Sequence, residues 1–219
     1  MYDAFISHIK QRNLFEPNQR YLLACSGGLD SMALAHLLLT AGVPFELAYV
    51  NFGLRDSESD GDEEFVKKWG VAHGLLVHVH RAKTKDWAET NGISTQMAAR
   101  EIRYQFFEEI RSKHNLAGIV VAHQEDDQLE TIFLNLTRGT GIEGVYGMSE
   151  RRGELIRPLL PFHEHSLPPM QKRFSLPGGK TARMLPPITK EISYAIKGCP
   201  LFTVWNPIRV KICCKALPD

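Results

Sequence analysis

Short apolar runs alternate with longer amphipathic segments along most of the chain. The runs that predict β-strands are Tyr21–Cys25, Phe45–Val50, Leu75–His80 and Gly118–Ala122. The segments with apolar residues at helical spacing are Tyr2–Ile9, Asp30–Ala41, Ser59–His73, Ser94–His114 and Asp126–Thr137. Strands that alternate with helices predict an α/β fold, here a doubly wound, mainly parallel five-stranded sheet with helices on both faces. In such sheets ligands bind beyond the carboxyl ends of the strands.

The turn after the first predicted strand carries the most specific motif of the chain. It reads S-G-G-L-D-S and consists of Ser26, Gly27, Gly28, Leu29, Asp30 and Ser31. The two glycines allow the backbone to approach a ligand, and the following helix offers free N–H groups and a positive dipole end. A polyphosphate is therefore the expected ligand. The Walker A loop needs a different pattern, G-x-x-x-x-G-K-[ST], and a plain strand-to-helix turn is the less favoured alternative.

Polar residues also gather after the fourth predicted strand, where His123 precedes four acids in the segment 125–130. Asp127 and Glu130 lie three residues apart, hence on one face of the predicted helix. Acids in the first turn of a helix are favourable in themselves because of the helix dipole. That explanation covers a single acid better than a histidine and several acids at a strand end. Carboxylates in this position can hold Mg²⁺ against phosphate oxygens.

Two further segments have both a functional and a structural explanation. Arg100 and Arg103 lie at i, i+3 on one face of the helix 94–114, where a solvated basic stripe is the competing explanation. The segment 138–147 begins at Arg138 and has four glycines within residues 139–147. It is either a loop that closely approaches a ligand or a plain connection.

These motifs occur together and in a fixed order: S-G-G-L-D-S, A-R-x-x-R-Y, A-H-x-x-D-D-Q-x-E-T, R-G-x-G-x-x-G and R-P-L-L. In this combination the chain resembles the catalytic domain of the tRNA(Ile)-lysidine synthases over about residues 18–162. The first motif alone is shared by many ATP enzymes that release pyrophosphate, whereas the combination is much more specific. The chain departs from the family at Phe52, where a histidine is frequent, and at Gln124, where a second histidine is common.

The resemblance implies an enzyme that uses ATP and Mg²⁺ to adenylate the C2 carbonyl oxygen of the wobble cytidine in a tRNA(Ile) with the anticodon CAU. Free L-lysine would then displace AMP. The catalytic residues implied are Asp30, Arg103, His123 and Asp127, of which Asp30 and Asp127 also bind the metal. The residues implied to contact tRNA or lysine are Arg100, Glu130 and Arg138, while residues 26–31 bind the nucleotide. A helix dipole, Mg²⁺ and arginines suit such chemistry because charge builds up on the phosphates.

The composition places the chain among globular proteins, since 43% hydrophobic residues suffice for a sizeable core. There is no run of about 18 apolar residues and no basic-then-apolar start, so we expect a cytoplasmic protein without a membrane partner. The four cysteines fit neither a zinc spacing nor a disulfide framework; they are Cys25, Cys199, Cys213 and Cys214. The oligomeric state stays open, a homodimer included.

The composition changes abruptly after residue 162. Residues 1–162 carry 17 Lys and Arg against 22 Asp and Glu, a net charge of −5, whereas residues 163–219 carry 9 against 3, a net charge of +6. Eight of the twelve prolines lie in the second part. We therefore divide the chain into a catalytic domain, 1–162, and a Pro-rich basic tail, 163–219, that we expect to be poorly ordered. A genuine basic tail that binds RNA is the less favoured alternative.

The tail lacks two motifs that the family has at this place, W-x-x-D-x-S-N and Y-x-R-N-x-I-R. Both reappear when Pro177–Lys197 is translated in a shifted frame, with the third base of each codon joined to the first two of the next. With suitable synonymous codons this frame encodes W-R-E-D-S-S-N-A-T-T-N-Y-K-R-N-F-I-R-N-K. A frameshift near residues 162–163, in the gene or in its sequencing, explains both the missing motifs and the change in composition.

Two other kinds of function stay open. A tRNA thiolase or an amide-forming synthetase shares the first motif, although a thiolase normally needs a catalytic cysteine or cluster ligands, and only Cys25 precedes residue 163. From a different class, a truncated nucleotide-binding protein would bind ATP and turn over little.

The shifted-frame hypothesis predicts that residues from about 163 onward form no compact domain, because an out-of-frame chain loses the binary pattern that buries one face. Limited proteolysis should cut this part first, and its amides should exchange quickly. The gene should encode the W-R-E-D-S-S-N stretch in the other frame, and restoring the frame should restore lysidine formation. A protease-resistant fold over Leu176–Leu217, or a gene without that stretch, would contradict the hypothesis.

Overall fold

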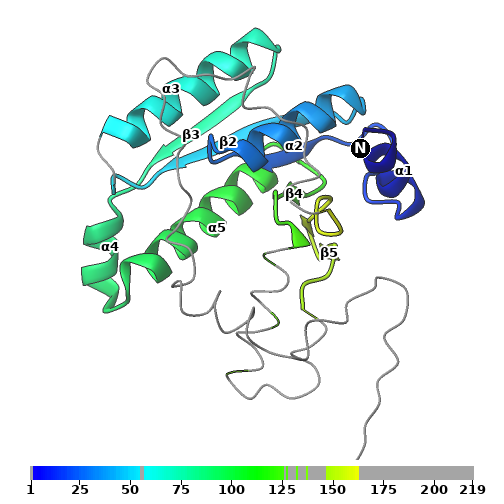
Figure 1. Ribbon diagram of the computed structural model, residues 1–219. Coiled ribbons are helices and arrows are strands. Elements are labelled where there is room, and N and C mark those ends of the chain that lie inside the picture. Colours follow the sequence, from blue (N-terminus) through cyan, green and yellow to red (C-terminus); the bar gives the residue numbers. More distant parts are fainter. Residues whose placement is uncertain are drawn as a thin grey trace, which may run out of the picture. The chain divides into compact units, whose positions relative to one another are not determined.

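The computed structural model describes residues 2–54, 57–125 and 147–162, together with Asp127, Ile132 and Thr137 (Figure 1). The predicted helix 126–137 lies largely outside the described residues, and the tail 163–219 lies wholly outside them. The helices are α1 (Tyr2–Gln11), α2 (Leu29–Thr40), α3 (Ser57–Ala72), α4 (Thr84–Asn91) and α5 (Thr95–Lys113). The strands are β1 (Tyr21–Ala24), β2 (Phe45–Asn51), β3 (Val77–Arg81), β4 (Ile119–Val120), β5 (Arg151–Arg152) and β6 (Leu155–Ile156).

The strands form one sheet in the order β3-β2-β1-β4-β6-β5. Neighbouring strands are parallel except β5 and β6, which form an antiparallel pair at one edge. Leu23 of β1 lies opposite Leu47 of β2 on one side and opposite Val120 of β4 on the other. The carboxyl ends of β1, β2, β4 and β6 therefore meet at the same side of the sheet, where ligands bind in such folds. The predicted α/β fold with a mainly parallel sheet is confirmed.

Helices cover both faces of the sheet, with α1, α2 and α3 on one face and α5 on the other (Figure 1). The core on the first face includes Leu23, Leu47 and Tyr49 of the sheet and Phe5, Leu37 and Val66 of the helices. The core on the second face includes Leu22, Ala48 and Val50 of the sheet and Ile102, Phe106 and Ile110 of α5. Because successive residues of a strand point to opposite faces, continuous apolar strands such as β1 supply both cores.

Helix α2 is apolar on nearly every side rather than amphipathic. Seven of its twelve residues are buried, from Ser31 to Leu38. A helix with this pattern must be covered on several sides, and α2 lies between its neighbours α1 and α3 over the sheet (Figure 1). The loop that precedes α2 is therefore attached to one of the most firmly packed elements of the fold.

Two features of the fold differ from the sequence prediction. The sheet has six strands instead of five, because β5 and β6 have two residues each and are too short to show an alternating pattern. Helix α4 was not predicted, since only Thr84 and Ala88 of its eight residues are buried. It ends at Gly92, whose φ of 64° is left-handed, as is common after a helix. In the part of the chain that is described, no helix is long and apolar enough to cross a membrane.

Gly70 of α3 lies where the helix packs on the sheet. A Cβ there would overlap Cγ2 of Val77 and lie 3.3 Å from Cδ1 of Leu47. Gly70→Ala should therefore lower the free energy of unfolding by about 1–3 kcal/mol through overpacking. Gly61→Ala in the same helix is the matched control, because no described atom lies within 4 Å of the added Cβ; it should raise stability by about 0.5–1 kcal/mol. Urea unfolding followed by circular dichroism measures both changes, and equal effects would contradict this packing.

Candidate active site

The loop between β1 and α2 is held in shape by its own serines. The hydroxyl of Ser31 donates to the carbonyl of Gly28 at 2.9 Å and accepts from the N–H of Ser26 at 3.2 Å. The hydroxyl of Ser26 lies 3.2 Å from that of Ser31 and accepts from the N–H of Gly28 at 3.3 Å. Ser31 is 2% exposed, whereas Ser26 is exposed. Ser31 therefore shapes the loop, and Ser26 presents its hydroxyl at the surface.

The same loop leaves the N-terminus of α2 open to a ligand. Gly27 has a φ of +78°, a conformation that favours glycine, and a Cβ there would lie 3.2 Å from Cβ of Asp62. Gly28 is the N-cap residue, and among the described residues no side chain caps the helix. The first N–H groups of a helix have no partner within it, so together with the helix dipole they attract an anion.

A charged network holds the carboxyl end of β2. Asn51, the last residue of β2, donates from Nδ2 to Asp60 at 3.0 Å and to Glu63 at 3.2 Å. Arg81, at the end of β3, and Lys67 also donate to Glu63. Burial alone would raise the pKa of Glu63, but the hydrogen bonds from these partners lower it to about 2. The ionised carboxylate thus ties α3 to the ends of both strands.

Two arginines of α5 lie over aromatic rings. The guanidinium carbon of Arg103 is 5.1 Å from the centre of the Phe52 ring, and that of Arg100 is 5.1 Å from the centre of the Tyr104 ring. Burial of its guanidinium, with a further effect of the Arg100 charge, lowers the pKa of Arg103. Arginine nevertheless stays charged in proteins. The rings therefore support two cations on α5 through cation–π contacts.

His123 and Arg157 form a pair just beyond the ends of β4 and β6. Nε of Arg157 donates to Nδ1 of His123 at 3.2 Å, and Nη1 donates to the carbonyl of Ser149 at 2.9 Å. Since an arginine can only donate, Nδ1 of His123 carries no hydrogen and the ring hydrogen lies on Nε2. Burial lowers the pKa of His123; Asp127 opposes this effect, and Arg157 and the two arginines of α5 reinforce it. The neutral ring therefore offers an N–H donor.

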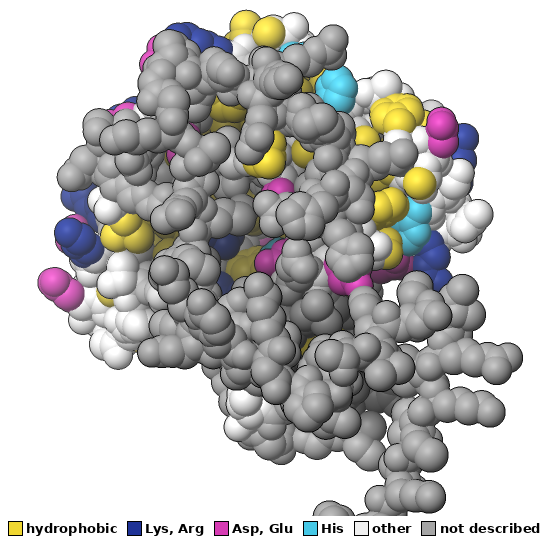
Figure 2. Space-filling model, in the orientation of Figure 1, with side chains coloured by type: hydrophobic (Ala, Val, Ile, Leu, Met, Phe, Trp, Pro, Cys, Tyr) yellow, Lys and Arg dark blue, Asp and Glu magenta, His cyan; other side chains and the backbone are white. Residues whose placement is uncertain are grey.

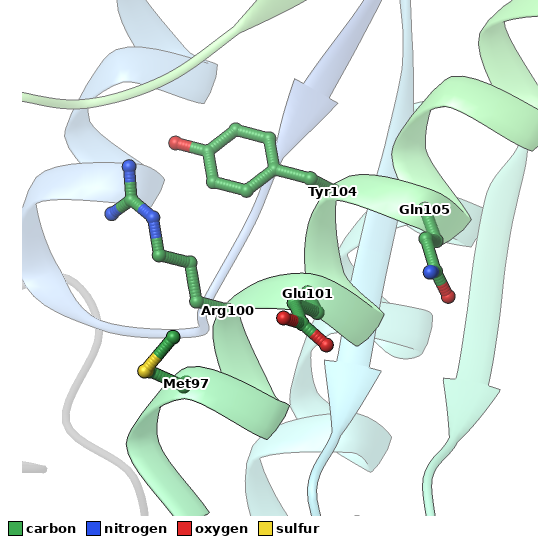
Figure 3. Close-up of a pocket in the computed structure, with 5 residues that line it drawn as sticks. All are labelled: Met97, Arg100, Glu101, Tyr104 and Gln105. Atoms are coloured by element: carbon green, nitrogen blue, oxygen red, sulfur yellow. The ribbon is translucent and has the colours of Figure 1, made fainter. Parts of the chain in front are cut away.

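A hollow of about 440 Å³ lies along α5 (Figure 3). Its lining residues are Met97, Arg100, Glu101, Tyr104 and Gln105. Figure 3 shows Arg100 and Tyr104 extending to the same side of the helix, and Met97 is 53% exposed. A cation, an aromatic ring and an apolar side chain together can contact the face of a planar ring.

Basic and acidic side chains both occur around the margins of the face shown in Figure 2. Over residues 1–162 the net charge is −5. A polyanion would be attracted by individual cations, such as Arg100, and not by the net charge of this part of the chain.

The structure brings four of the predicted site residues together. The charges of Asp127, Arg100 and Arg103 all act on His123, so these four residues lie near one another beyond the carboxyl end of β4. Oδ2 of Asp127 accepts from the backbone N–H of Gln124 at 2.8 Å. This bond holds the Asp127 carboxylate beside the backbone of Gln124.

Other predicted residues have different outcomes. Asp30, in the first turn of α2, is only partly exposed and its Oδ1 is buried, although such an acid usually faces solvent. Glu130 and Arg138 lie outside the described residues. Arg157 is the residue that the motifs did not single out as part of the site. The motif R-P-L-L could have indicated Arg157, because this residue directly follows the carboxyl end of β6. That strand has only two residues and could not be recognised in the sequence.

A comparison with protein families matches most of the chain. The model of the PP-loop domain matches residues 1–175. This chain belongs to the PP-loop domain family. All the described residues of this PP-loop domain lie within the match, including β1, α2 and the loop between them.

Curated relatives of this PP-loop domain are named tRNA(Ile)-lysidine synthase. The relative from Bacteroides thetaiotaomicron is 44% identical over 155 residues, which cover 71% of this chain and 36% of the relative. The relative from Clostridium acetobutylicum is 37% identical over 172 residues, which cover 76% of this chain and 37% of the relative. The chain thus spans about a third of the length of these curated relatives.

Among solved structures, the U34-tRNA thiolase NcsA from Methanococcus maripaludis, with its 4Fe-4S cluster, superposes with a TM-score of 0.67. The sequence identity is 15%, and the match covers 89% of this chain and 72% of that chain. At this identity the likeness shows a shared fold alone.

The pairing of His123 with Arg157 predicts a change in titration. Arg157→Gln should raise the pKa of His123, because it removes a nearby positive charge, and Asp127→Asn should lower it, because it removes the opposing negative charge. NMR titration of the ring protons measures both shifts, with His123→Gln to assign the signal. Arg152→Gln is the control, since the charge of Arg152 acts on Arg157 but is not among the largest influences on His123. An unchanged or lower pKa in Arg157→Gln would contradict the pairing.

Proposed function

We propose that this PP-loop domain modifies tRNA in an ATP-dependent reaction, and specifically that it joins free L-lysine to the wobble cytidine of a tRNA(Ile) with the anticodon CAU. ATP adenylates the C2 carbonyl oxygen of the cytidine and pyrophosphate leaves; the amine of lysine then displaces AMP. The family match, the names of the relatives and the order of the five motifs support this assignment.

The observation that carries the proposal is the open N-terminus of α2 behind the S-G-G turn. Gly27 and Gly28 place no side chain between a phosphate and the backbone N–H groups of the helix. Negative charge builds up on the attacked phosphate in the transition state. Donors that are already fixed in place stabilise that charge without reorganisation. The bonds of Ser31 within the loop supply this fixed geometry.

We propose that carboxylates near the carboxyl ends of the strands hold a magnesium ion. We assign Asp30 and Asp127 as its ligands, because Mg²⁺ takes oxygen ligands and is commonly bound through one or two carboxylates plus substrate phosphates. The hydrogen bond from Gln124 orients Asp127. When bound, the ion neutralises charge on the phosphates.

The remaining roles follow from charge and hydrogen bonding. We assign Arg100 and Arg103 to phosphate groups of ATP or tRNA, for which a guanidinium is a bidentate donor. His123 donates from Nε2 to the substrate, and Arg157 holds it in this tautomer. Glu130 and Arg138 stay predicted contacts to tRNA or lysine.

Sulfur transfer fits these residues less well. In the described part of the chain Cys25 is the one cysteine, and it is 3% exposed. Burial raises the pKa of its thiol, whereas the thiolate is the form that attacks sulfur or binds a cluster. The other three cysteines lie in the tail 163–219, which we propose to add nothing to catalysis.

The assignment of Asp30 generates a mutational prediction. Asp30→Ala should slow the tRNA-dependent exchange of labelled pyrophosphate into ATP by more than about 100-fold, since a group beside the phosphates is lost. Far-UV circular dichroism should stay unchanged. Asp86→Ala is the matched control, because Asp86 is also a first-turn acid, on α4, and is exposed. Normal exchange in Asp30→Ala would contradict the role of this residue.

Three measurements separate the proposed steps. Equilibrium dialysis with MgATP tests the loop, pyrophosphate exchange with tRNA(Ile) tests adenylation, and lysine-dependent release of AMP tests the transfer. Binding of ATP without exchange would favour a truncated nucleotide-binding protein. Pyrophosphate exchange together with AMP release that depends on ammonia or a sulfur donor, and not on lysine, would favour another enzyme of the PP-loop family. The chain with its restored reading frame is the positive control.

A further inference from the structure

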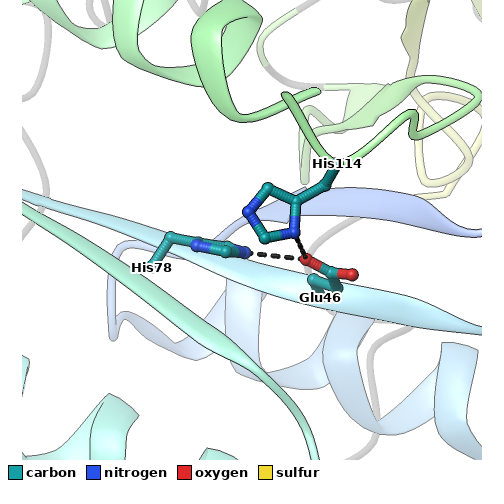
Figure 4. A group of neighbouring side chains, drawn as sticks. All are labelled: Glu46, His78 and His114. Carbon is teal, nitrogen blue, oxygen red and sulfur yellow. Dashed lines mark hydrogen bonds and ion pairs between the residues drawn. The ribbon is translucent and has the colours of Figure 1, made fainter. Parts of the chain in front are cut away.

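Three potential metal ligands meet on the α5 side of the sheet, outside the candidate active site. Nε2 of His78 lies 2.7 Å from Oε2 of Glu46, and Nδ1 of His114 lies 3.2 Å from the same oxygen (Figure 4). All three ligand atoms lie within 4.8 Å of one another. The side chains of Glu46, His78 and His114 are 5%, 12% and 26% exposed. The cluster is therefore sheltered, with access past His114.

Three different elements hold these side chains. Glu46 is near the start of β2, and His78 is near the start of β3, where it lies opposite Ala48. The small side chain of Ala48 leaves room for His78 to reach diagonally toward Glu46. His114 is the C-cap residue of α5, a position where the helix dipole favours a cation.

We propose that Glu46, His78 and His114 bind a zinc ion. Two imidazole nitrogens and one carboxylate oxygen are ligands that zinc accepts at about 2.0–2.2 Å. Tetrahedral coordination at such distances separates the ligand atoms by about 3.4 Å, so each of the two separations from Oε2 has to widen by less than about 1 Å. Magnesium and calcium, in contrast, prefer sites made of oxygen ligands.

Zinc binding at this cluster involves no redox change. Each neutral imidazole coordinates through the nitrogen that now faces Glu46, and its hydrogen moves to the other ring nitrogen. Arg20 lies 2.7 Å from Oε1 of Glu46, which turns Oε2 toward the histidines, as outer partners of metal ligands commonly do. Because Arg20 is 57% exposed, solvent screens its charge. A water molecule completes the coordination from the open side.

The location indicates a structural role for the ion. The cluster lies at the amino ends of β2 and β3, whereas the S-G-G turn follows the carboxyl end of β1. Zinc at this place would join the end of α5 to two strands, and so hold the helix that carries Arg100 and Arg103. The proposal does not depend on the proposed reaction.

Calorimetric titration of the 219-residue chain with Zn²⁺ tests the proposal, after alkylation of accessible cysteines so that thiols of the tail do not bind. The wild type should bind one equivalent more than Glu46→Gln and His78→Gln. His114→Gln should bind this equivalent at least about tenfold more weakly, since loss of even an outer partner costs about 10–100-fold. The matched control is His80→Gln, which should keep the site: His80 shares the strand and face of His78 but stacks on Phe106 at 5.2 Å.

Cobalt(II) gives a second readout on the wild type alone, independent of how the variants fold. The alkylated chain should show visible bands of a tetrahedral nitrogen–oxygen site without thiolate-to-cobalt charge transfer. Zinc should also raise the midpoint of thermal unfolding of the wild type and of His80→Gln, but not of Glu46→Gln. Absence of binding in the wild type would overturn the proposal, and so would binding by the three ligand variants as tight as that of the wild type. Charge-transfer bands without the bands of a nitrogen–oxygen site would also overturn it.

Discussion

The parallel pairing of β1 with β2 on one side and β4 on the other is the constraint on which the site depends. Parallel strands place all their carboxyl ends on one side of a sheet. The S-G-G turn, Asn51, His123 and Arg157 each follow such an end, although they lie far apart in the sequence. The two residue pairs between β4 and β6 suffice to bring Arg157 to His123, 34 residues away.

The polar groups at this edge are held in two ways. Near β1 the backbone itself is fixed, through the hydroxyl of Ser31 and the open end of α2. Near α5 the charges sit on long side chains, and aromatic rings restrict them: Phe52 lies under Arg103 and Tyr104 under Arg100. Phe52, one of the two departures from the family pattern, therefore has a defined place in the structure.

The sequence allowed prediction of the features that are local. β1 is a continuous apolar run of strand length and β2 is mostly apolar, as is typical of strands buried on both faces, and the S-G-G turn is specified by neighbouring residues. The short β5 and β6 and the polar α4 lack any period that a pattern could reveal. Neither the partner of His123 nor the burial of Glu46 inside a predicted strand could be inferred, because both depend on the order of strands in the sheet.

The last described residue, Phe162, packs against the first helix. Its ring lies 6.3 Å from that of Phe5 and 5.6 Å from that of His8, centre to centre. During synthesis α1 leaves the ribosome long before residue 162, and this contact forms only after residue 162 has emerged. The apolar face of α1, with Phe5 and Ile9, is therefore without part of its cover while most of the domain is being translated. Nascent chains at that stage expose apolar side chains of α1, which makes them candidates for chaperone binding.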